Sequence, residues 1–253
     1  MLINLEGIDG AGKSTQIALL ASTFKDAIIT KEPGATPLGE QIRKIILGDN
    51  LNICHQAEMF LFLADRAEHY EKIIKPNRDK IVFCDRSIIS GIAYAMTNLG
   101  LNLDEISREN LNKNLSASIK NPNANLVVNK TDKNVNPNNK NTTNLDSNPT
   151  QISQIYEKFQ MLINLNKIAL QNDFNAKFIF LKIDEASLIS RLKIRIKEQD
   201  IKADTIEKRG ISYLLKVQKN IESVIEILGL NALKIDANLD KNEILNQIKE
   251  FIR

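Results

Sequence analysis

The residues best suited to chemistry in this sequence stand near its start, where Gly7, Gly12, Lys13 and Ser14 match the spacing G-x-x-x-x-G-K-S. Glycines let the backbone curl so that successive N–H groups point at a phosphate, and a helix beginning near Lys13 adds the positive end of its dipole. The lysine would reach the β- and γ-phosphates of a nucleoside triphosphate, and the serine hydroxyl would ligate Mg²⁺. The loop residues expected at the phosphates are Gly7, Ile8, Asp9, Gly10, Ala11, Gly12, Lys13, Ser14 and Thr15.

Short apolar segments alternate with helical patterns along the chain. The expected strands are residues 2–6, 27–30, 80–85, 177–183 and 232–235. Because apolar and polar residues do not strictly alternate in them, these segments are typical of buried parallel strands. The expected helices are residues 14–24, 39–47, 56–74, 87–99, 155–171, 185–197 and 204–228. This order predicts an α/β fold with a parallel sheet between helices, and ligands in such sheets bind beyond the carboxyl ends of the strands.

A second chemical feature follows the apolar segment at residues 81–84, where Asp85 and Arg86 stand side by side. A carboxylate at the end of a buried strand can orient a metal shell, so Asp85 joins Ser14 as a candidate metal ligand. Arg86 could clamp the phosphate of an acceptor. The residues alone also allow a plain ion pair at the end of the strand.

Composition excludes several classes of protein. The 253 residues are 43% hydrophobic and 26% charged, and the net charge of +3 is too small to argue for nucleic acid or an acidic membrane as partner. We expect no membrane span, because no apolar run approaches about 18 residues. We also expect no signal peptide, and cytoplasmic localisation with Cys54 and Cys84 as buried free thiols. His55 and His69 are assigned no metal or catalytic role.

Residues 110–150 break the alternating pattern. From 110 to 148, roughly one residue in three is Asn, and aromatic residues are absent. Such a composition buries too little apolar surface to offset the entropy of ordering. We expect a disordered insertion within a single domain covering residues 1–253, although a separate small binding module is the alternative.

Three further motifs follow the phosphate loop in order. They are T-K-E-P-G-A-T at residues 30–36, F-L-F-L-A-D-R-A-E-H at 60–69 and D-R-S-I-I-S-G-I-A-Y at 85–94. Together with the loop, they resemble the bacterial thymidylate kinase family nearly from end to end, apart from the insertion. The chain departs from the family pattern at Lys31, Ala35, Ser87 and Thr205.

The resemblance implies a three-layer P-loop kinase fold, with a central five-stranded parallel sheet and a helical lid at residues 190–207. It implies a transferase that moves the γ-phosphate of ATP to dTMP, giving dTDP, with Mg²⁺ as cofactor. It also implies a homodimer whose ligands are nucleotides, while the small net charge and the lack of long apolar runs lead us to expect no nucleic acid or membrane partner. Transfer between two polyanions requires cations and in-line alignment, so Lys13 and Arg86 are expected to be catalytic. The resemblance adds Asp9 to the expected catalytic residues.

The resemblance further implies roles around dTMP. Phe62 and Arg66 lie four residues apart on one helix face, where the family stacks on thymine and hydrogen-bonds it. The residues alone also allow Phe62 as core and Arg66 paired with Glu58 or Glu68. Asp9 resembles the family's acidic residue near the acceptor, and Tyr94 the tyrosine that packs on the sugar; a buried structural tyrosine is the alternative. The expected dTMP-binding residues are Glu32, Pro33, Phe62, Arg66, Arg86, Ser90 and Tyr94.

The expected lid carries two candidates for a catalytic arginine, Arg191 and Arg195, spaced i,i+4. The family pattern D-R-x-E is broken at Thr205, which leaves open which arginine acts. A solvated basic helix face is the alternative for both.

Three other functions are weighed against this one. Residues 129–132 read N-K-T-D, the guanine-recognition motif of GTPases, but the place of a D-x-x-G motif reads Asp85-Arg86-Ser87-Ile88. Another nucleotide or deoxynucleoside kinase would share the loop, the lid and the Asp-Arg pair. A non-catalytic nucleotide-binding member of the family is the third alternative, because of the departures from its motifs.

Overall fold

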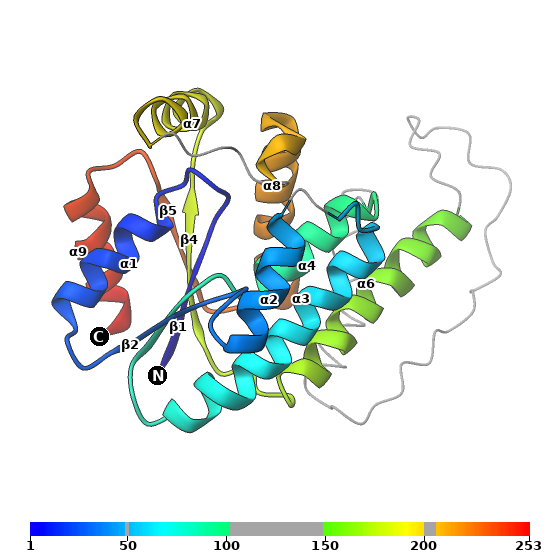
Figure 1. Cartoon of the computed structure of the whole chain (residues 1–253), viewed down its shortest axis with the longest axis horizontal. Helices are drawn as coiled ribbons and strands as arrows, with labels where there is room; N and C mark the ends of the chain where they lie inside the picture. The colour runs from blue at the N-terminus through cyan, green and yellow to red at the C-terminus, as the bar shows by residue number, and fades with distance from the viewer. Residues whose placement is uncertain (49–50, 102–148, 200–205) are drawn as a thin grey trace, which may run out of the picture.

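The computed structural model describes residues 1–48, 51–101, 149–199 and 206–253 (Figure 1). Its sheet has five strands, all parallel, in the order β2-β3-β1-β4-β5. The strands are β1 (Leu2–Glu6), β2 (Ile28–Lys31), β3 (Val82–Asp85), β4 (Lys177–Lys182) and β5 (Ala232–Asp236). The expected α/β class and five-stranded parallel sheet are therefore confirmed.

Helices cover both sides of the sheet and give the fold three layers. Figure 1 shows α1 (Lys13–Thr23) and α9 (Lys241–Ile252) on one side. The other side carries α2 (Pro37–Leu47), α3 (His55–His69), α4 (Ile88–Asn98), α6 (Pro149–Ala169) and α8 (Ile211–Leu228). The remaining helix, α7 (Glu185–Gln199), lies across the edge where the parallel strands end.

Burial follows the position of each strand in the sheet. The inner strands are almost wholly buried, as Ile3, Leu5, Phe83 and Phe180 show with no exposed surface. The edge strands β2 and β5 instead mix buried and exposed residues, because each has a neighbour on one side only. The hydrophobic core thus holds β1, which carries the phosphate loop, rigidly in the middle of the sheet.

Several expected helix boundaries are wrong for local reasons. The helix expected at 204–228 begins only at Ile211, since Gly210 has a positive φ of 91°. The helix expected at 56–74 ends as an α-helix at His69 and continues as a π-helical turn, Tyr70–Ile74, before a 3₁₀ turn at Lys75–Asn77. A further 3₁₀ turn, Glu207–Arg209, precedes α8.

Helix α9 was not predicted from the sequence. Asp240 caps this helix and forms a capping box with Glu243, while Ile244, Ile248 and Ile252 lie buried on one face. Both signals are visible in the sequence, because the capping box and the i, i+4, i+8 spacing are local patterns.

The expected insertion at residues 110–150 falls almost entirely outside the described residues. Its last two positions, 149 and 150, are instead the first residues of α6. The N-K-T-D segment at 129–132 also lies outside the described residues, as does Thr205. Cys84 is buried as expected, but Cys54 is exposed, so the expectation of two buried thiols is wrong for that residue.

Candidate active site

The three loops with candidate residues meet at one edge of the sheet because their strands are parallel neighbours. Asp85 of β3 is in register with Leu5 of β1 on one side and Lys31 of β2 on the other. The loop after each strand therefore starts at the same level of the sheet.

The phosphate loop takes a backbone path that requires glycine. Gly7, Gly10 and Gly12 have φ values of 147°, 87° and 94°, a region that L side chains rarely adopt. A Cβ at Gly7 would also lie 2.8 Å from the carbonyl oxygen of Leu181. Inside the curl, the buried Lys13 donates from Nζ to the carbonyl oxygen of Ile8 at 3.1 Å. The expected strand, loop and helix are thus all present.

An open pocket surrounds this loop. Its lining includes Asp9 to Gln16, together with Arg191 and Arg195 from α7. The C-terminal part of the chain supplies the rest of the wall, which the sequence analysis did not anticipate because it missed α9: Ala237, Leu239, Asp240, Lys241 and Ile244.

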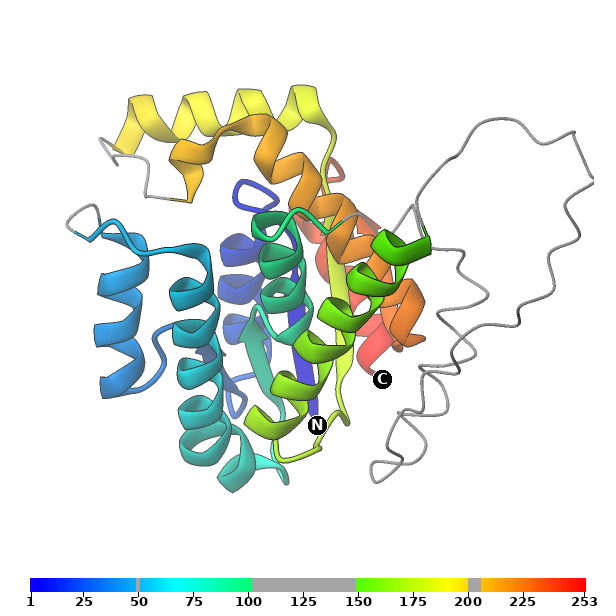
Figure 2. The same cartoon turned by 90° about the vertical axis from the view of Figure 1, so that its right-hand side faces the viewer.

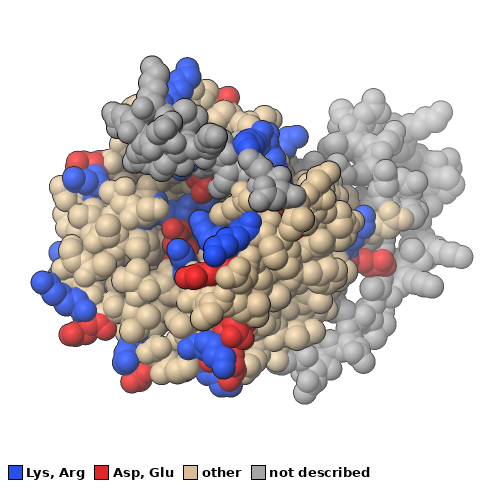
Figure 3. Space-filling model, viewed as in Figure 1, with Lys and Arg blue, Asp and Glu red and all other residues tan. Residues whose placement is uncertain are grey.

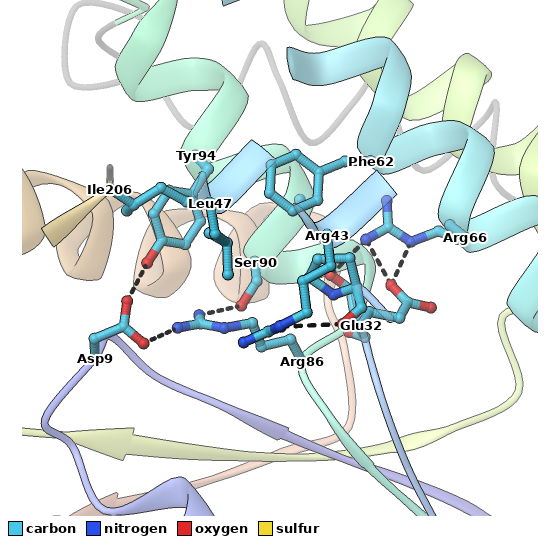
Figure 4. A pocket seen from close by; sticks show the side chains of 13 residues that line it. Asp9, Glu32, Arg43, Leu47, Phe62, Arg66, Arg86, Ser90, Tyr94 and Ile206 are labelled. Carbon is cyan, nitrogen blue, oxygen red and sulfur yellow. Dashed lines mark hydrogen bonds and ion pairs between the residues drawn. The ribbon is translucent and has the colours of Figure 1, made fainter. Parts of the chain in front are cut away.

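A second pocket lies between α2, α3 and α4 (Figure 4). It brings together all of the residues expected around dTMP, and Asp9 with them: Asp9, Glu32, Pro33, Phe62, Arg66, Arg86, Ser90 and Tyr94. The residues that the sequence analysis missed are Arg43, Leu47, Ser87, Gly91 and Ile206. Since Asp9 lines both pockets, they meet at this carboxylate.

Arg86 holds the residues at the junction of the two pockets in place. Its guanidinium donates to Asp9 Oδ1 at 2.6 Å, to the Gly7 carbonyl oxygen at 3.0 Å and to Ser90 Oγ at 3.3 Å. Tyr94 donates to the other oxygen of Asp9 at 3.4 Å, as Figure 4 shows. Burial opposes ionisation of Asp9, but the charges of Arg86 and Lys13 outweigh it and lower its pKa to about 2. Asp9 is therefore an anion at any physiological pH.

Glu6 supports the site from beneath and was not predicted from the sequence. It has no exposed surface, and its two carboxylate oxygens accept hydrogen bonds from the hydroxyls of Ser87 and Ser90. Burial raises its pKa, although both serines oppose that shift. Glu6 thereby ties the end of β1 to the segment that follows Arg86. A carboxylate at the end of an apolar strand was the signal in the sequence.

Arg66 lies in the wall of the pocket and is only 2% exposed. It donates from Nε to Glu32 Oε2 at 2.9 Å, from Nη1 to Asn166 Oδ1 at 2.6 Å and from Nη2 to the Ser87 carbonyl oxygen at 3.0 Å. The alternative that Arg66 pairs with Glu58 or Glu68 is wrong, since its carboxylate partner is Glu32.

Two further contacts hold this ion pair in place. His69, fully buried, joins Glu32 Oε1 through Nδ1 at 3.0 Å and Thr30 Oγ1 through Nε2 at 2.7 Å. A Cβ added at Gly91 would lie 2.7 Å from both terminal nitrogens of Arg66, so the missing side chain leaves room for the guanidinium. Burial opposes ionisation of Glu32, yet Arg66 and His69 lower its pKa.

The two arginines of α7 differ in their contacts. Arg191 donates to the carbonyl oxygens of Gly10 at 3.3 Å and Ala237 at 2.6 Å, so backbone groups hold it against the phosphate loop. Arg195, one turn further on, acts electrostatically on Asp9 and helps to lower the pKa of that carboxylate. Both line the phosphate-loop pocket.

The two candidate metal ligands lie at different depths. Ser14 is exposed at the start of α1. Asp85 Oδ1 is buried and has no hydrogen-bond partner among the described residues. Burial lowers the pKa of Lys13, and the negative charge of Asp85 opposes that shift. An orphaned carboxylate oxygen beside the phosphate loop is the kind of ligand that Mg²⁺ prefers.

Basic side chains thus line both pockets, with Arg43, Arg66 and Arg86 in one and Lys13, Arg191 and Arg195 in the other. Figure 3 shows Lys and Arg side chains, with Asp and Glu side chains beside them, in a hollow at the centre of this face. Two cation-lined pockets that meet at one carboxylate, above a parallel sheet and a phosphate loop, define a phosphotransferase of the P-loop kinase fold.

Comparisons with known proteins agree with this class. The family model for thymidylate kinase matches residues 5–173. Thymidylate kinases of Campylobacter hominis and Campylobacter fetus are 44% and 38% identical to this chain, each over 100% of both chains. The crystal structure of a thymidylate kinase from Ehrlichia chaffeensis has a TM-score of 0.59 at 20% identity, covers 100% of this chain and 97% of that one, and supports the fold. The chain belongs to the thymidylate kinase family.

Family membership confirms the resemblance seen in the sequence and contradicts the GTPase alternative. Among the described residues, no helix is long and apolar enough to cross a membrane.

One buried carboxyl group next to the second pocket is incompletely paired. Asp65 is 1% exposed, and its Oδ1 accepts the Gly34 N–H at 3.0 Å. Its Oδ2 is buried with no partner among the described residues. Burial raises the pKa of Asp65 to about 6, against the opposing hydrogen bond from Gly34. Asp65 therefore holds the loop beside Pro33 while titrating near neutrality.

This raised pKa predicts a pH-dependent stability. Between the unfolded value of about 3.9 and the folded value of about 6, the folded state binds more protons, so stability falls as pH rises through this window. Asp65→Asn keeps the acceptor for Gly34 and removes the titration. We expect the Tm of D65N minus that of the wild type to increase between pH 4 and pH 7 in thermal melts. The surface variant Asp26→Asn is the control, and parallel pH profiles for D65N and wild type would contradict the prediction.

Proposed function

We propose that this chain transfers the γ-phosphate of ATP, held in the phosphate-loop pocket, to dTMP held in the second pocket, and releases dTDP. The observation that carries the proposal is the junction of the two pockets at Asp9, beside Arg86. An acceptor phosphate at Arg86 would face the end of a triphosphate lying in the loop. Membership of the thymidylate kinase family supports the choice of substrate.

On the acceptor side, we assign the dTMP phosphate to Arg86. Phe62 would stack on the thymine ring, in an apolar upper part of the pocket that also contains Leu47 and Ile206 (Figure 4). Arg66 would donate to the base from a fixed position, because Glu32, Asn166 and Ser87 hold its guanidinium. The polar partners of Arg66 thus determine where its guanidinium can donate a hydrogen bond to a carbonyl oxygen of the base.

The sugar would lie between Tyr94 and Asp9. The Tyr94 ring packs 5.4 Å from the Arg86 guanidinium, and its hydroxyl bonds Asp9. A ring held in this way leaves little space for a 2′-hydroxyl, which would explain a preference for the deoxyribose. Ser90 completes this side by accepting from Arg86 while donating to Glu6.

On the donor side, Lys13 would exchange the Ile8 carbonyl oxygen for phosphate oxygens when ATP enters. Backbone N–H groups of residues 7–15 would cradle the phosphates. Ser14 and Asp85 would hold Mg²⁺ together with phosphate oxygens, since one offers an exposed hydroxyl and the other an orphaned carboxylate oxygen. Bound there, the ion would neutralise part of the phosphate charge.

We assign the catalytic role in α7 to Arg195 and a binding role to Arg191. Arg191 already donates hydrogen bonds to the carbonyl oxygens of Gly10 and Ala237, and these bonds fix its guanidinium in the wall of the phosphate-loop pocket. Arg195 lies close enough to Asp9 to affect its ionisation, and Asp9 marks the junction where the phosphoryl group would be transferred. A cation at that place stabilises charge that develops during transfer.

We also propose a homodimer formed through α3 and α6, and a cytoplasmic location. The two helices pack side by side and expose large apolar side chains: Phe60 on α3, and Met161 and Ile168 on α6. Met161, Leu165 and Ile168 follow i, i+4, i+7 spacing, so they form one stripe. Ile168 is 74% exposed, which favours burial against a second copy.

The proposed cytoplasmic location is supported by the two free thiols, which suit a reducing compartment.

The first prediction from these proposals concerns substrate choice. Purified chain with ATP and Mg²⁺ should release ADP fastest with dTMP, in a panel that includes dUMP, dCMP, dGMP, AMP and thymidine. Lys13→Ala should lower kcat at least about a hundredfold, the scale of losing one preorganised charge contact. The exposed Lys25→Ala variant is the control. Turnover of AMP or thymidine without turnover of dTMP would overturn the assignment.

The two arginines of α7 should give different kinetics. Arg195→Ala should lower kcat and kcat/KM together by about 10²-fold or more, because its contact is made in the transition state. Arg191→Ala should mainly raise the KM for ATP. Steady-state kinetics with Lys193→Ala, an exposed neighbour on the same helix, provide the control. A reversed pattern would transfer the catalytic role to Arg191.

The dimer proposal predicts a change in mass. The double variant Met161→Glu and Ile168→Glu should convert a dimer to a monomer in size-exclusion chromatography with light scattering, because two charges would have to be buried. Glu250→Lys, exposed on α9 on the opposite side of the sheet, should leave the mass unchanged. A monomeric wild type, or a double variant that stays dimeric, would disprove this interface.

A further inference from the structure

A compact polar cluster lies one helical turn beyond the second pocket. It consists of Arg209 from the 3₁₀ turn before α8, Glu58 from α3, Asn98 from α4 and Tyr213 from α8. Arg209 donates to Glu58 Oε2 at 2.5 Å, to Asn98 Oδ1 at 2.9 Å and to the Tyr213 hydroxyl at 2.8 Å. One guanidinium thus joins three helices.

The other polar atoms of the cluster are also paired. Tyr213 donates to Asn98 Oδ1 at 2.7 Å, and Asn98 Nδ2 donates to Glu58 Oε1 at 3.0 Å. Burial raises the pKa of Tyr213 to about 12, so its hydroxyl keeps the proton that it donates. Glu58 is 2% exposed, and its charge is balanced by Arg209. A fully paired network of this kind fixes the distance between the helices that share it.

The spacing along α3 and α4 connects this cluster to the pocket. On α3, Glu58, Phe62 and Arg66 follow i, i+4, i+8 spacing and share one face. On α4, Tyr94 and Asn98 are likewise one turn apart. Phe62 and Tyr94 line the pocket, and Glu58 and Asn98 are tied together one turn beyond them.

A second connection runs through the backbone. The Arg209 N–H donates to the carbonyl oxygen of Ile206 at 3.1 Å, and Ile206 is a buried wall residue of the pocket. The ring of Tyr213 also packs against that of Tyr94, with centroids 6.3 Å apart. The backbone of Arg209 therefore holds Ile206, and its side chain supports Tyr94 through Tyr213, although Arg209 does not line the pocket itself.

We propose that Arg209 is a positioning residue that sets the width of the base-binding slot, and that the cluster selects pyrimidine over purine monophosphates. A purine carries a second fused ring and needs a wider gap between Phe62, Ile206 and Tyr94. Clamping α3 to α4 and α8 one turn beyond that gap keeps it narrow. The inference rests on the proposed placement of dTMP in this pocket.

Kinetics of four variants test it. Arg209→Ala and Ile206→Ala should each raise the KM for dTMP at least about tenfold with kcat changed less than about threefold, since uniform binding is lost. Each should raise kcat/KM for dGMP relative to dTMP at least about tenfold. Arg209→Lys keeps the charge but loses the planar fork, so its effects should be intermediate. The matched control, exposed Lys208→Ala, should behave as wild type.

The combination of Arg209→Ala with Ile206→Ala should change selectivity no more than either alone, because both act on one wall. A folded Arg209→Ala or Arg209→Lys protein that loses thermal stability but keeps wild-type KM and selectivity would overturn this inference alone. Additive effects of Arg209→Ala and Ile206→Ala on selectivity would also overturn this inference. A wild-type chain inactive on dTMP would instead overturn the proposed function, and this inference with it.

Discussion

The ion pair between Arg86 and Asp9 is the contact on which the arrangement of the two pockets depends. Arg86 follows β3 and Asp9 belongs to the loop after β1, so the pair joins neighbouring strands at the point where both pockets open. Arg86 takes a left-handed φ of 75°, which costs of order 1–3 kcal/mol for a residue other than glycine. Its bonds to Asp9, Gly7 and Ser90 maintain that conformation.

Glu6 lies at the end of β1 and holds the segment after Arg86 in place through hydrogen bonds. A buried carboxylate without partners would be strongly destabilising, yet each oxygen of Glu6 accepts from a serine hydroxyl. The serines come from one turn of α4 and its N-cap, so Glu6 anchors the start of that helix to β1. Ser87, which departs from the family pattern, is thus a structural partner of Glu6 in this chain.

The sequence predicted what depends on local pattern or on motif order. The five strands, the phosphate loop and most of the residues gathered around the second pocket were predicted in this way. It could not predict partners that depend on distant elements, such as Asn166 for Arg66, a hundred positions apart. The α7 arginines could not be told apart either, because Ala237 reaches Arg191 only after β5 has joined the sheet. In contrast, α9 was missed although its cap and periodicity are local.

The positions of the two cysteines have a practical consequence. Cys84 is buried in β3, and burial raises its pKa well above the usual range, so it is poorly reactive. Cys54 is exposed at the N-cap position of α3, the helix that carries Phe62 and Arg66. Since the chain has no other cysteine, a maleimide fluorophore would attach at one defined point, and its emission would report movement of α3 when nucleotides bind, without any engineered label site.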